Sequence, residues 1–439
     1  MLYSILKFTS GALIMEIQYC IRVIVMEHGE RFPVIIDCNG IPDFYSTIFA
    51  MSVLRARNLA SNSIENSLRA ILIFNTFLDS YSINLQKRFS EGIALHINEL
   101  NSHIRVCRLP TAAIRSFLSG SHAQKIKNAK VIHLEKYRYR AEHGESEVSI
   151  GLIVTRLMYI REYLTWRIEN YLIRIAFDDP RRAQLISIKT SLGRVMRSLS
   201  PRINRYGSRT PREGLALKDY ERLLEVIKLD SADNPWCGEH TRARNELMVL
   251  WLSSLGLRRG ELLNVRITDI TGFDDAVRIE RRAGDLSDPR RKQPTVKTLG
   301  RELNLSDLLQ EKTQVYISDY RSQIPLARKH SFLFVSNSGL PLSLDGCAKV
   351  FAVLRAKRSE LPKDLTPHIL RHTWNDNFSR FVDAGNIDEE HEKKWRSHQM
   401  GWRETSQTAG MYLHRYIREE AQNANMEMQK LKRKRENNE

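Results

Sequence analysis

The sequence predicts a mainly α-helical protein with a small antiparallel β-sheet, organised in at least two domains. At 439 residues the chain is longer than one hydrophobic core usually organises. Apolar residues recur at helical spacing from about residue 46 to residue 175. Strand-like segments are short, and most of them follow Asp269.

Residues 1–45 are predicted to form an N-terminal extension or arm. Residues 17–45 alternate weakly between polar and apolar around glycines, which is typical of a short hairpin. The start, "MLYSILKFTSGALIM", has no basic region followed by an apolar core, so neither a signal peptide nor a membrane anchor is expected. Met15 is an alternative start. No run approaches the roughly 18 apolar residues of a membrane span.

Residues 46–175 have the pattern of a helical domain. Asn62 followed by Glu65 predicts a helix start before "LRAILIFNTFLDSY". A second helix, near 152–175, interleaves arginines, Arg156 and Arg167 among them, with apolar positions. One face of such a helix could pack while the other meets phosphates. An amphipathic helix with a solvated basic face explains any single arginine equally well.

Residues 176–214 are predicted to be a basic linker. Its end, "PRINRYGSRTPREG", has two prolines, two glycines and a single acid, a composition typical of linkers. Its charge suits a segment lying along a phosphate backbone. The arginines of this strap, residues 201–214, are Arg202, Arg205, Arg209 and Arg212.

A second domain is predicted over 215–425, followed by a basic tail, 426–439. It contains the apolar helix "RNELMVLWLSSLGL" and three strand-like segments, "AVRIERR", "RELNL" and "SFLFVS". The last of these precedes an Asn-Ser-Gly turn, after which the pattern is mostly helical.

Charge and cysteine content narrow the class of protein. The 68 Lys and Arg exceed the 51 Asp and Glu by 17, and the pI is about 9.7. Such a field favours polyanionic partners, with nucleic acid first and an acidic membrane surface second, although a basic surface also serves solubility. The five cysteines are dispersed, without a CxxC pair or a Cys/His cluster. This predicts a reducing cytosol and no metal site.

Four short segments carry candidate chemistry, and Arg258 lies in the first, "SSLGLRRGELLNVRITDI". It follows the Gly256 turn, with Glu261 three residues on to hold its guanidinium, an arrangement suited to phosphate recognition. Lys297, in the second, is expected at the turn end of a β-hairpin, where its ammonium could reach into a cleft. An ordinary surface residue is the alternative for each.

The third segment, "LTPHILRHTWND", places His368 in the first turn of a helix that begins at Thr366 or Pro367. Arg371 follows one turn later on the same face, so both could converge on an anion at the helix N-terminus. His372 is expected to point elsewhere and to pack.

The fourth segment, "RSHQMGWRETSQTAGMYLHR", leads through Gly401-Trp402 to Tyr412. With 15 tyrosines in the chain, a half-buried core residue is the alternative for Tyr412.

Taken in order, these segments resemble the tyrosine recombinase (phage integrase) family. The motif Gly-Leu-Arg-x-x-Glu-Leu, a hairpin lysine, His-x-x-Arg, Gly-Trp and a tyrosine all occur in sequence over about 215–420. More loosely, 46–175 resembles the family's helical, SAM-like core-binding domain. Most members have a second histidine where this chain has Trp402, and His398 is a rival for that position. Tyr416 is a rival nucleophile.

The resemblance implies a two-domain, C-shaped clamp on double-stranded DNA. It implies attack by Tyr412 on phosphorus, leaving a 3′-phosphotyrosyl bond and a free 5′-hydroxyl, without metal, ATP or another cofactor. The implied roles are phosphate binding by Arg258, Arg371 and Trp402, proton donation by Lys297, and proton acceptance or phosphate binding by His368.

The resemblance also implies a homotetramer on two DNA sites in a prokaryotic cytoplasm, serving a phage or mobile element. It leaves open whether accessory DNA-bending proteins take part. Three other classes of protein are alternatives to a recombinase. A type IB topoisomerase uses the same chemistry, whereas a DNA-binding protein without catalytic activity would account for the net charge but not for the ordered motif residues. A metal-dependent nuclease would need clustered carboxylates beyond those of "DDP" and "DEEHE".

Overall fold

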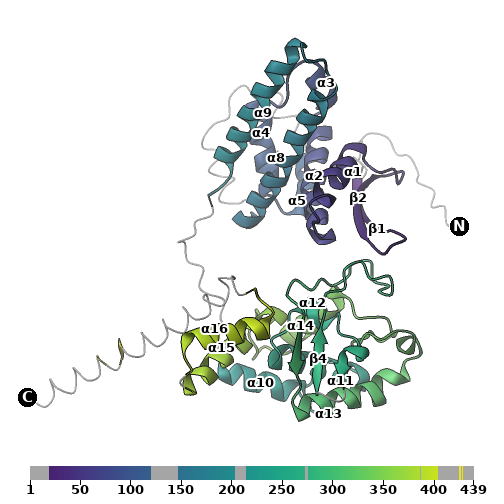
Figure 1. Cartoon of the computed structure of the whole chain (residues 1–439), viewed down its shortest axis with the longest axis vertical. Helices are drawn as coiled ribbons and strands as arrows, with labels where there is room; N and C mark the ends of the chain where they lie inside the picture. Colours follow the sequence, from purple (N-terminus) through teal and green to yellow (C-terminus); the bar gives the residue numbers. More distant parts are fainter. Residues whose placement is uncertain are drawn as a thin grey trace, which may run out of the picture. The chain divides into compact units, whose positions relative to one another are not determined.

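The computed structural model describes residues 19–119, 147–202, 214–271, 275–385, 387–403, 425–426 and 428. The chain divides into two compact units, residues 1–26 with 31–207 and residues 27–30 with 208–439 (Figure 1). Helices predominate in these residues, and the strands form two small antiparallel sheets. The predicted mainly α fold class with a small antiparallel sheet is confirmed. The C-shaped arrangement of two domains stays a prediction. No helix in the described ranges is long and apolar enough to cross a membrane.

The first unit begins with a two-stranded hairpin. Strands β1 (Tyr19–Val25) and β2 (Arg31–Asp37) pair antiparallel, in a register that runs from Tyr19 opposite Asp37 to Val25 opposite Arg31. The side chains of β2 are almost all buried and join the same core as the helices. The hairpin predicted within 17–45 is therefore part of this unit's core.

The remaining first unit is helical, with short connections. In chain order, its helices are α1 (Phe44–Phe49) with its π-helical continuation η1 (Ala50–Arg55), α2 (Ser61–Ser80), α3 (Leu85–Ser90), α4 (Ile97–Arg108), α5 (Thr111–Ser119), α8 (Ile150–Leu172) and α9 (Pro180–Leu199). Helix α2 starts at Ser61, one residue before the predicted cap Asn62. Glu65 instead lies in the helix and pairs with Arg69 at 2.7 Å.

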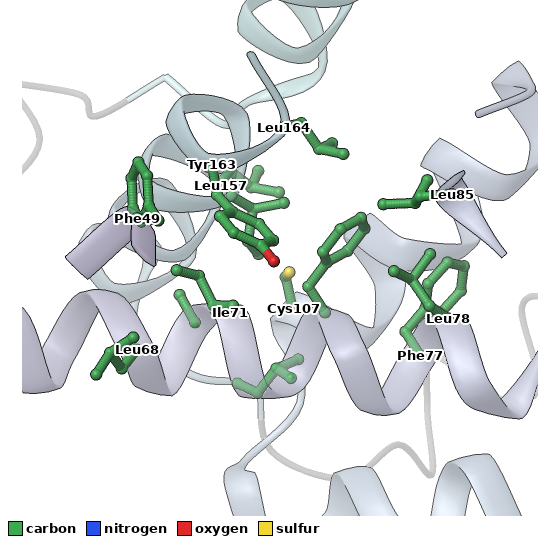
Figure 2. Packing of buried hydrophobic residues seen from close by; sticks show 14 of the residues in the cluster. Phe49, Leu68, Ile71, Phe77, Leu78, Leu85, Cys107, Leu157, Tyr163 and Leu164 are labelled. Atoms are coloured by element: carbon green, nitrogen blue, oxygen red, sulfur yellow. The ribbon is translucent and has the colours of Figure 1, made fainter. Parts of the chain in front are cut away.

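The core of this unit lies between α2, α4 and α8. Figure 2 shows Ile71 of α2 on the side that faces Leu157 and Tyr163 of α8, with Cys107 of α4 near the Tyr163 ring. These apolar residues recur on one face of each helix, as the helical period requires. Burial of that shared face is what holds these helices together.

Part of the predicted linker 176–214 is a helix of the first unit. Helix α9 starts at the N-cap Asp179, whose side chain accepts a hydrogen bond from Arg181 N, and has Pro180 in its first turn. Its buried residues, Leu185, Leu192 and Met196, belong to the first unit's core. The composition typical of a linker is thus confined to the segment after Leu199, of which 203–213 lie outside the described residues.

The second unit surrounds a three-stranded antiparallel sheet of order β3-β4-β5. Its strands are β3 (Ile270–Thr271), β4 (Ala276–Ile279) and β5 (Arg301–Asn304). Its helices are α10 (Leu217–Ile227), α11 (Glu239–Ser254), α12 (Arg259–Leu262), α13 (Asp307–Val315), α14 (Leu344–Lys357), α15 (Pro367–Ala384) and α16 (Glu389–Met400), with short turns η2 (Ile267–Asp269), η3 (Tyr316–Tyr320), η4 (Arg321–Gln323) and η5 (Pro325–Lys329).

Helix α11 forms the centre of this unit's core and packs against α10, α13 and α15. Its Trp251 is fully buried, and the indole N–H donates to Thr313 Oγ1 at 3.1 Å. The segments predicted to be strands at "AVRIERR" and "RELNL" correspond to β4 and β5. The strand predicted at "SFLFVS" is wrong, because this segment makes only isolated bridges, Arg266 with Phe332 and Val335 with Pro341.

Candidate active site

The turn between α11 and α12 presents Arg258. Gly256 has φ +61°, and a Cβ there would lie 2.5 Å from Met400 Cε and 3.0 Å from the Trp374 ring, so only glycine fits. Two residues later, the backbone N–H of Arg258 donates to Glu261 Oε2 at 3.0 Å and its Nη1 lies 3.4 Å from Glu261 Oε1. The guanidinium is held by Glu261, and the Arg258 side chain remains about one-third exposed.

Glu261 also contacts three other residues, which lie in two other segments of the chain. Its side chain has no exposed surface; Oε1 accepts from Thr298 Oγ1 at 2.7 Å and Oε2 accepts from Arg301 Nη2 at 2.9 Å. Arg371 Nη1 is 3.8 Å from Oε2. Burial opposes the carboxylate's charge, but Arg301, Arg371 and the Arg258 N–H outweigh it and lower the pKa of Glu261. Glu261 is therefore a buried anion that joins three segments: the Arg258 turn, the segment with Thr298 and Arg301, and helix α15.

Arg371 is the buried cation opposite it. The residue is only 2% exposed; Nη1 donates to Gly256 O at 2.6 Å and Nη2 to Met400 O at 3.2 Å. The helix that presents it, α15, starts at the N-cap Thr366, whose side chain accepts from Ile369 N. Arg371 therefore fixes α15 to the Gly256 turn and to the end of α16.

His368 lies exposed in the first turn of α15, as expected. The expectation that His372 points elsewhere is wrong. The two Nε2 atoms are 3.2 Å apart and the ring centroids 4.5 Å apart. Residues four apart are neighbours on one helix face, so this pairing follows from the helical period.

Lys297 is exposed, but it is not at a tight hairpin turn. Strands β4 and β5 do pair antiparallel. Their connection covers 280–300, and Lys297 lies near its end. This connection is anchored to the core, because Asn264 Nδ2 donates to Pro294 O at 2.7 Å and Val296 is buried.

Trp402 lies against Arg371, with the guanidinium carbon 5.5 Å from the ring centroid. Gly401 before it is left-handed, at φ +64°, and a Cβ would lie 2.9 Å from Thr298 Cβ and 3.0 Å from Leu299 O. Trp402 is only 8% exposed, whereas His398 is exposed on α16. Contact with Arg371 thus favours Trp402 over His398 as the site residue.

The structure therefore brings Arg258, Arg371 and Trp402 together around Glu261 and Gly401, and Lys297 immediately precedes Thr298, which contacts Glu261. Tyr412 and Tyr416 lie outside the described residues. So do three of the four strap arginines, Arg205, Arg209 and Arg212, while Arg202 is exposed. In the described ranges, no group of three or more His, Cys, Asp or Glu side chains is placed to hold a metal ion.

Two predicted DNA-binding residues are structural instead. Arg156 is 6% exposed, and its guanidinium donates to Cys107 O and Leu109 O, both at 2.8 Å. Arg167 is 8% exposed and stacks 3.5 Å from the Tyr45 ring centroid. Both side chains are therefore almost entirely buried against the first unit.

Sequence reasoning missed Thr298 and Arg301. Along β5, Arg301 and Leu303 are buried while their neighbours are exposed. An arginine in phase with the inward residues of a strand signals a buried acid. That signal does not identify Glu261 as the partner.

Residues 214–418 match the model of the phage integrase family. The matched range contains Arg258, Glu261, Lys297, His368, Arg371, Trp402 and Tyr412.

Two relatives with curated names are both tyrosine recombinase XerD. The protein from Halalkalibacterium halodurans is 23% identical over 261 residues, which cover 57% of this chain and 68% of the relative. The protein from Staphylococcus haemolyticus is 26% identical over 254 residues, covering 53% and 79%.

Solved structures of recombinases resemble the chain more remotely. The XerA recombinase has a TM-score of 0.35 at 15% identity, covering 87% of this chain and 97% of that chain. XerH bound to palindromic difH substrate, in a post-cleavage complex, has a TM-score of 0.42 at 16% identity, covering 79% and 92%. Likenesses at these TM-scores support no conclusion about this chain.

Proposed function

We propose that the protein is a site-specific DNA recombinase that cuts and rejoins strands through a 3′-phosphotyrosyl intermediate, since residues 214–418 match the model of the phage integrase family. The observation that supports the proposal is that Arg258 and Arg371 lie beside the buried Glu261, with Trp402 against Arg371 and Lys297 next to Thr298, which also contacts Glu261. The net charge of +17 suits double-stranded DNA as the partner.

In the first step, the Tyr412 hydroxyl attacks the phosphorus of a scissile phosphodiester. The new bond joins the tyrosine oxygen to phosphorus, and the bond from phosphorus to the 5′-oxygen breaks. The tyrosine proton passes to His368, and a proton from the Lys297 ammonium goes to the departing 5′-oxygen. The products are a 3′-phosphotyrosine and a free 5′-hydroxyl.

The two arginines act on the phosphate itself. Charge accumulates on its non-bridging oxygens in the transition state, and donors fixed in advance stabilise it at the least reorganisation cost. Arg258, whose side chain is held by Glu261 and is about one-third exposed, would make this contact. Arg371, which is buried next to Glu261, supplies a second positive charge. The indole of Trp402 packs against the Arg371 guanidinium.

Rejoining reverses these steps with a different 5′-hydroxyl. The phosphotyrosyl bond retains the free energy of the phosphodiester, so exchange of strands requires neither ATP nor metal. We propose that two DNA sites are brought together by a homotetramer in the cytoplasm of a prokaryotic cell. Movement of a phage or mobile element is the role that fits this exchange.

Recombination between two copies of a site tests the function directly. DNA that co-purifies with the protein would be sequenced and placed as direct repeats on a plasmid. We expect excision of a circle that retains one site. Relaxation of a plasmid without any site, with no excision, would identify a topoisomerase instead, and failure of both would contradict the proposal.

A further inference from the structure

Thr298 is the buried neighbour of the exposed Lys297. The Thr298 side chain is buried, and its hydroxyl makes two hydrogen bonds, one as donor and one as acceptor. It donates to Glu261 Oε1 at 2.7 Å and accepts from Arg301 Nη1 at 3.2 Å. The hydroxyl therefore occupies a fixed place between a buried carboxylate and a buried guanidinium.

The backbone on either side of Thr298 is also fixed. Leu299 N–H donates to Gly401 O at 3.0 Å, and the side chain of Val296 is buried. Lys297 thus projects from a segment that is held on both sides of it, at Val296 before it and at Thr298 and Leu299 after it. The lysine side chain is a flexible four-carbon stem, so the position of its ammonium group depends on how firmly the backbone at that residue is held.

The same contacts join Lys297 to the rest of the site. Glu261 holds Arg258 and lies beside Arg371, while Gly401 leads directly to Trp402. A shift of the Thr298 segment would therefore change the distance between the proton donor and the phosphate-binding arginines, without removing either.

We propose that Thr298 is a positioning residue, which holds the Lys297 ammonium where it can protonate the departing 5′-oxygen. This inference rests on the proposed function and on Lys297 as its proton donor. Lys297 loses a proton to that oxygen in cleavage and recovers one when the 5′-hydroxyl attacks in rejoining. Thr298 touches neither the phosphate nor the proton.

Two substrates separate positioning of the proton donor from general loss of structure. Both are synthetic nicked duplexes of the co-purified DNA site, one with oxygen and one with sulfur at the bridging 5′ position. Sulfur is a good leaving group that needs no protonation. Cleavage is measured as covalent protein–DNA adduct on a denaturing gel.

Thr298→Val keeps the shape of the side chain and removes both hydrogen bonds. We expect it to slow cleavage of the oxygen substrate by about 10- to 100-fold, since a misplacement of about 1 Å can cost 10²-fold. Cleavage of the sulfur substrate should stay within about two- to threefold of the wild-type rate, because its leaving group needs no proton from Lys297. Thr298→Ser, which retains the hydroxyl, should restore the oxygen substrate.

Lys297→Ala and the double variant complete the test. Adding Thr298→Val to Lys297→Ala should cause no further loss on the oxygen substrate, because both act on the same proton. Equal slowing of both substrates by Thr298→Val, or full additivity in the double variant, would overturn the inference. If Thr298→Val does not fold, Thr298→Ala takes its place with the same expected outcomes.

These results also distinguish the inference from the function on which it rests. Absence of a wild-type adduct on either substrate would contradict the proposed function. A wild-type adduct, with sulfur rescuing Lys297→Ala but not Thr298→Val, would contradict the positioning role alone.

Discussion

Glu261 is an anion without exposed surface, held by guanidinium groups, a hydroxyl and a backbone N–H. Removing one member of a buried charge group leaves the others uncompensated. At the scale of single residues, this carboxylate is therefore the point on which the site's geometry depends most.

We predict that Glu261→Gln destabilises the second unit by about 3–5 kcal/mol, the usual cost of breaking a buried ion pair. Five of the six tryptophans lie in this unit, so urea unfolding followed by tryptophan fluorescence reports on it. The control is Glu302→Gln, at an exposed position of β5, which should change stability by less than about 0.5 kcal/mol. Equal effects of the two changes would contradict the role of Glu261.

His103 makes the first unit sensitive to acid. It is fully buried, with its ring stacked on Phe77 at 4.9 Å between centroids, and burial lowers its pKa to about 3. In the unfolded chain the pKa is about 6.5, so between these values only the unfolded state binds the proton. We therefore expect the contribution of neutral His103 to the free energy of unfolding to be fully present above about pH 6.5. It should fall by about 1.4 kcal/mol per pH unit as the pH drops toward 3.

Hydrogen exchange of α2 and α4 peptides at pH 7 to 4, corrected for the intrinsic exchange rate, measures this loss. His103→Leu should remove most of the pH dependence, whereas His96→Gln, at an exposed position, should leave it unchanged. An unaltered profile in His103→Leu would assign acid sensitivity to other groups.

Motif residues could be predicted from the sequence, but most of their partners could not. Arg258, Glu261, His368 and Arg371 each stand at a recognisable place relative to a glycine or proline. Thr298 has no such signal, because its partner is distant in the chain and chosen by packing. Arg156 was expected to face DNA because arginine usually lies at the surface. Its guanidinium instead donates hydrogen bonds to carbonyl groups inside the first unit.

At the scale of elements, apolar periodicity predicted the long helices and failed where another property dominated. Helix α9 has apolar residues at helical spacing, Leu185, Leu192 and Met196 among them, but its arginines and its position suggested a linker. The "SFLFVS" segment is apolar enough for a strand. Short apolar runs do not by themselves determine pairing, and here only isolated bridges form.

A substitution at Gly401 tests the contact between the end of α16 and the segment that carries Lys297. It is left-handed, and the Gly401 carbonyl accepts from Leu299 N–H. Gly401→Ala would add strain from φ and place a methyl group within 3 Å of Thr298 and Arg301. We predict a loss of at least about 1 kcal/mol in stability and a fall in adduct formation. Gly151→Ala is the control, because an added Cβ at this exposed helical position meets nothing within 4 Å.

At the scale of the whole molecule, the charge of +17 predicts binding to DNA that depends strongly on salt. Each phosphate neutralised adds roughly −0.9 to the slope of log K against log salt on duplex DNA. Replacing Arg202, Arg205, Arg209 and Arg212 with Gln should therefore make the slope less steep, by up to about 3.6 if all four bind phosphates. An unchanged slope would make the strap a linker without contacts to DNA.

The central claim is that Tyr412 forms a covalent bond with DNA, and the most direct measurement is the identity of the residue linked to it. Tyrosine has a pKa near 10 and is a weak nucleophile at neutral pH, so it depends on a phosphate already held by the arginines. The wild-type protein and the Tyr412→Phe and Tyr416→Phe variants would be incubated with the nicked site, and the adduct mapped by peptide sequencing. We predict an adduct on Tyr412 that is absent only from Tyr412→Phe, which should still fold and bind DNA. An adduct lost only in Tyr416→Phe would move the nucleophile to that residue, and one that required magnesium would contradict the mechanism.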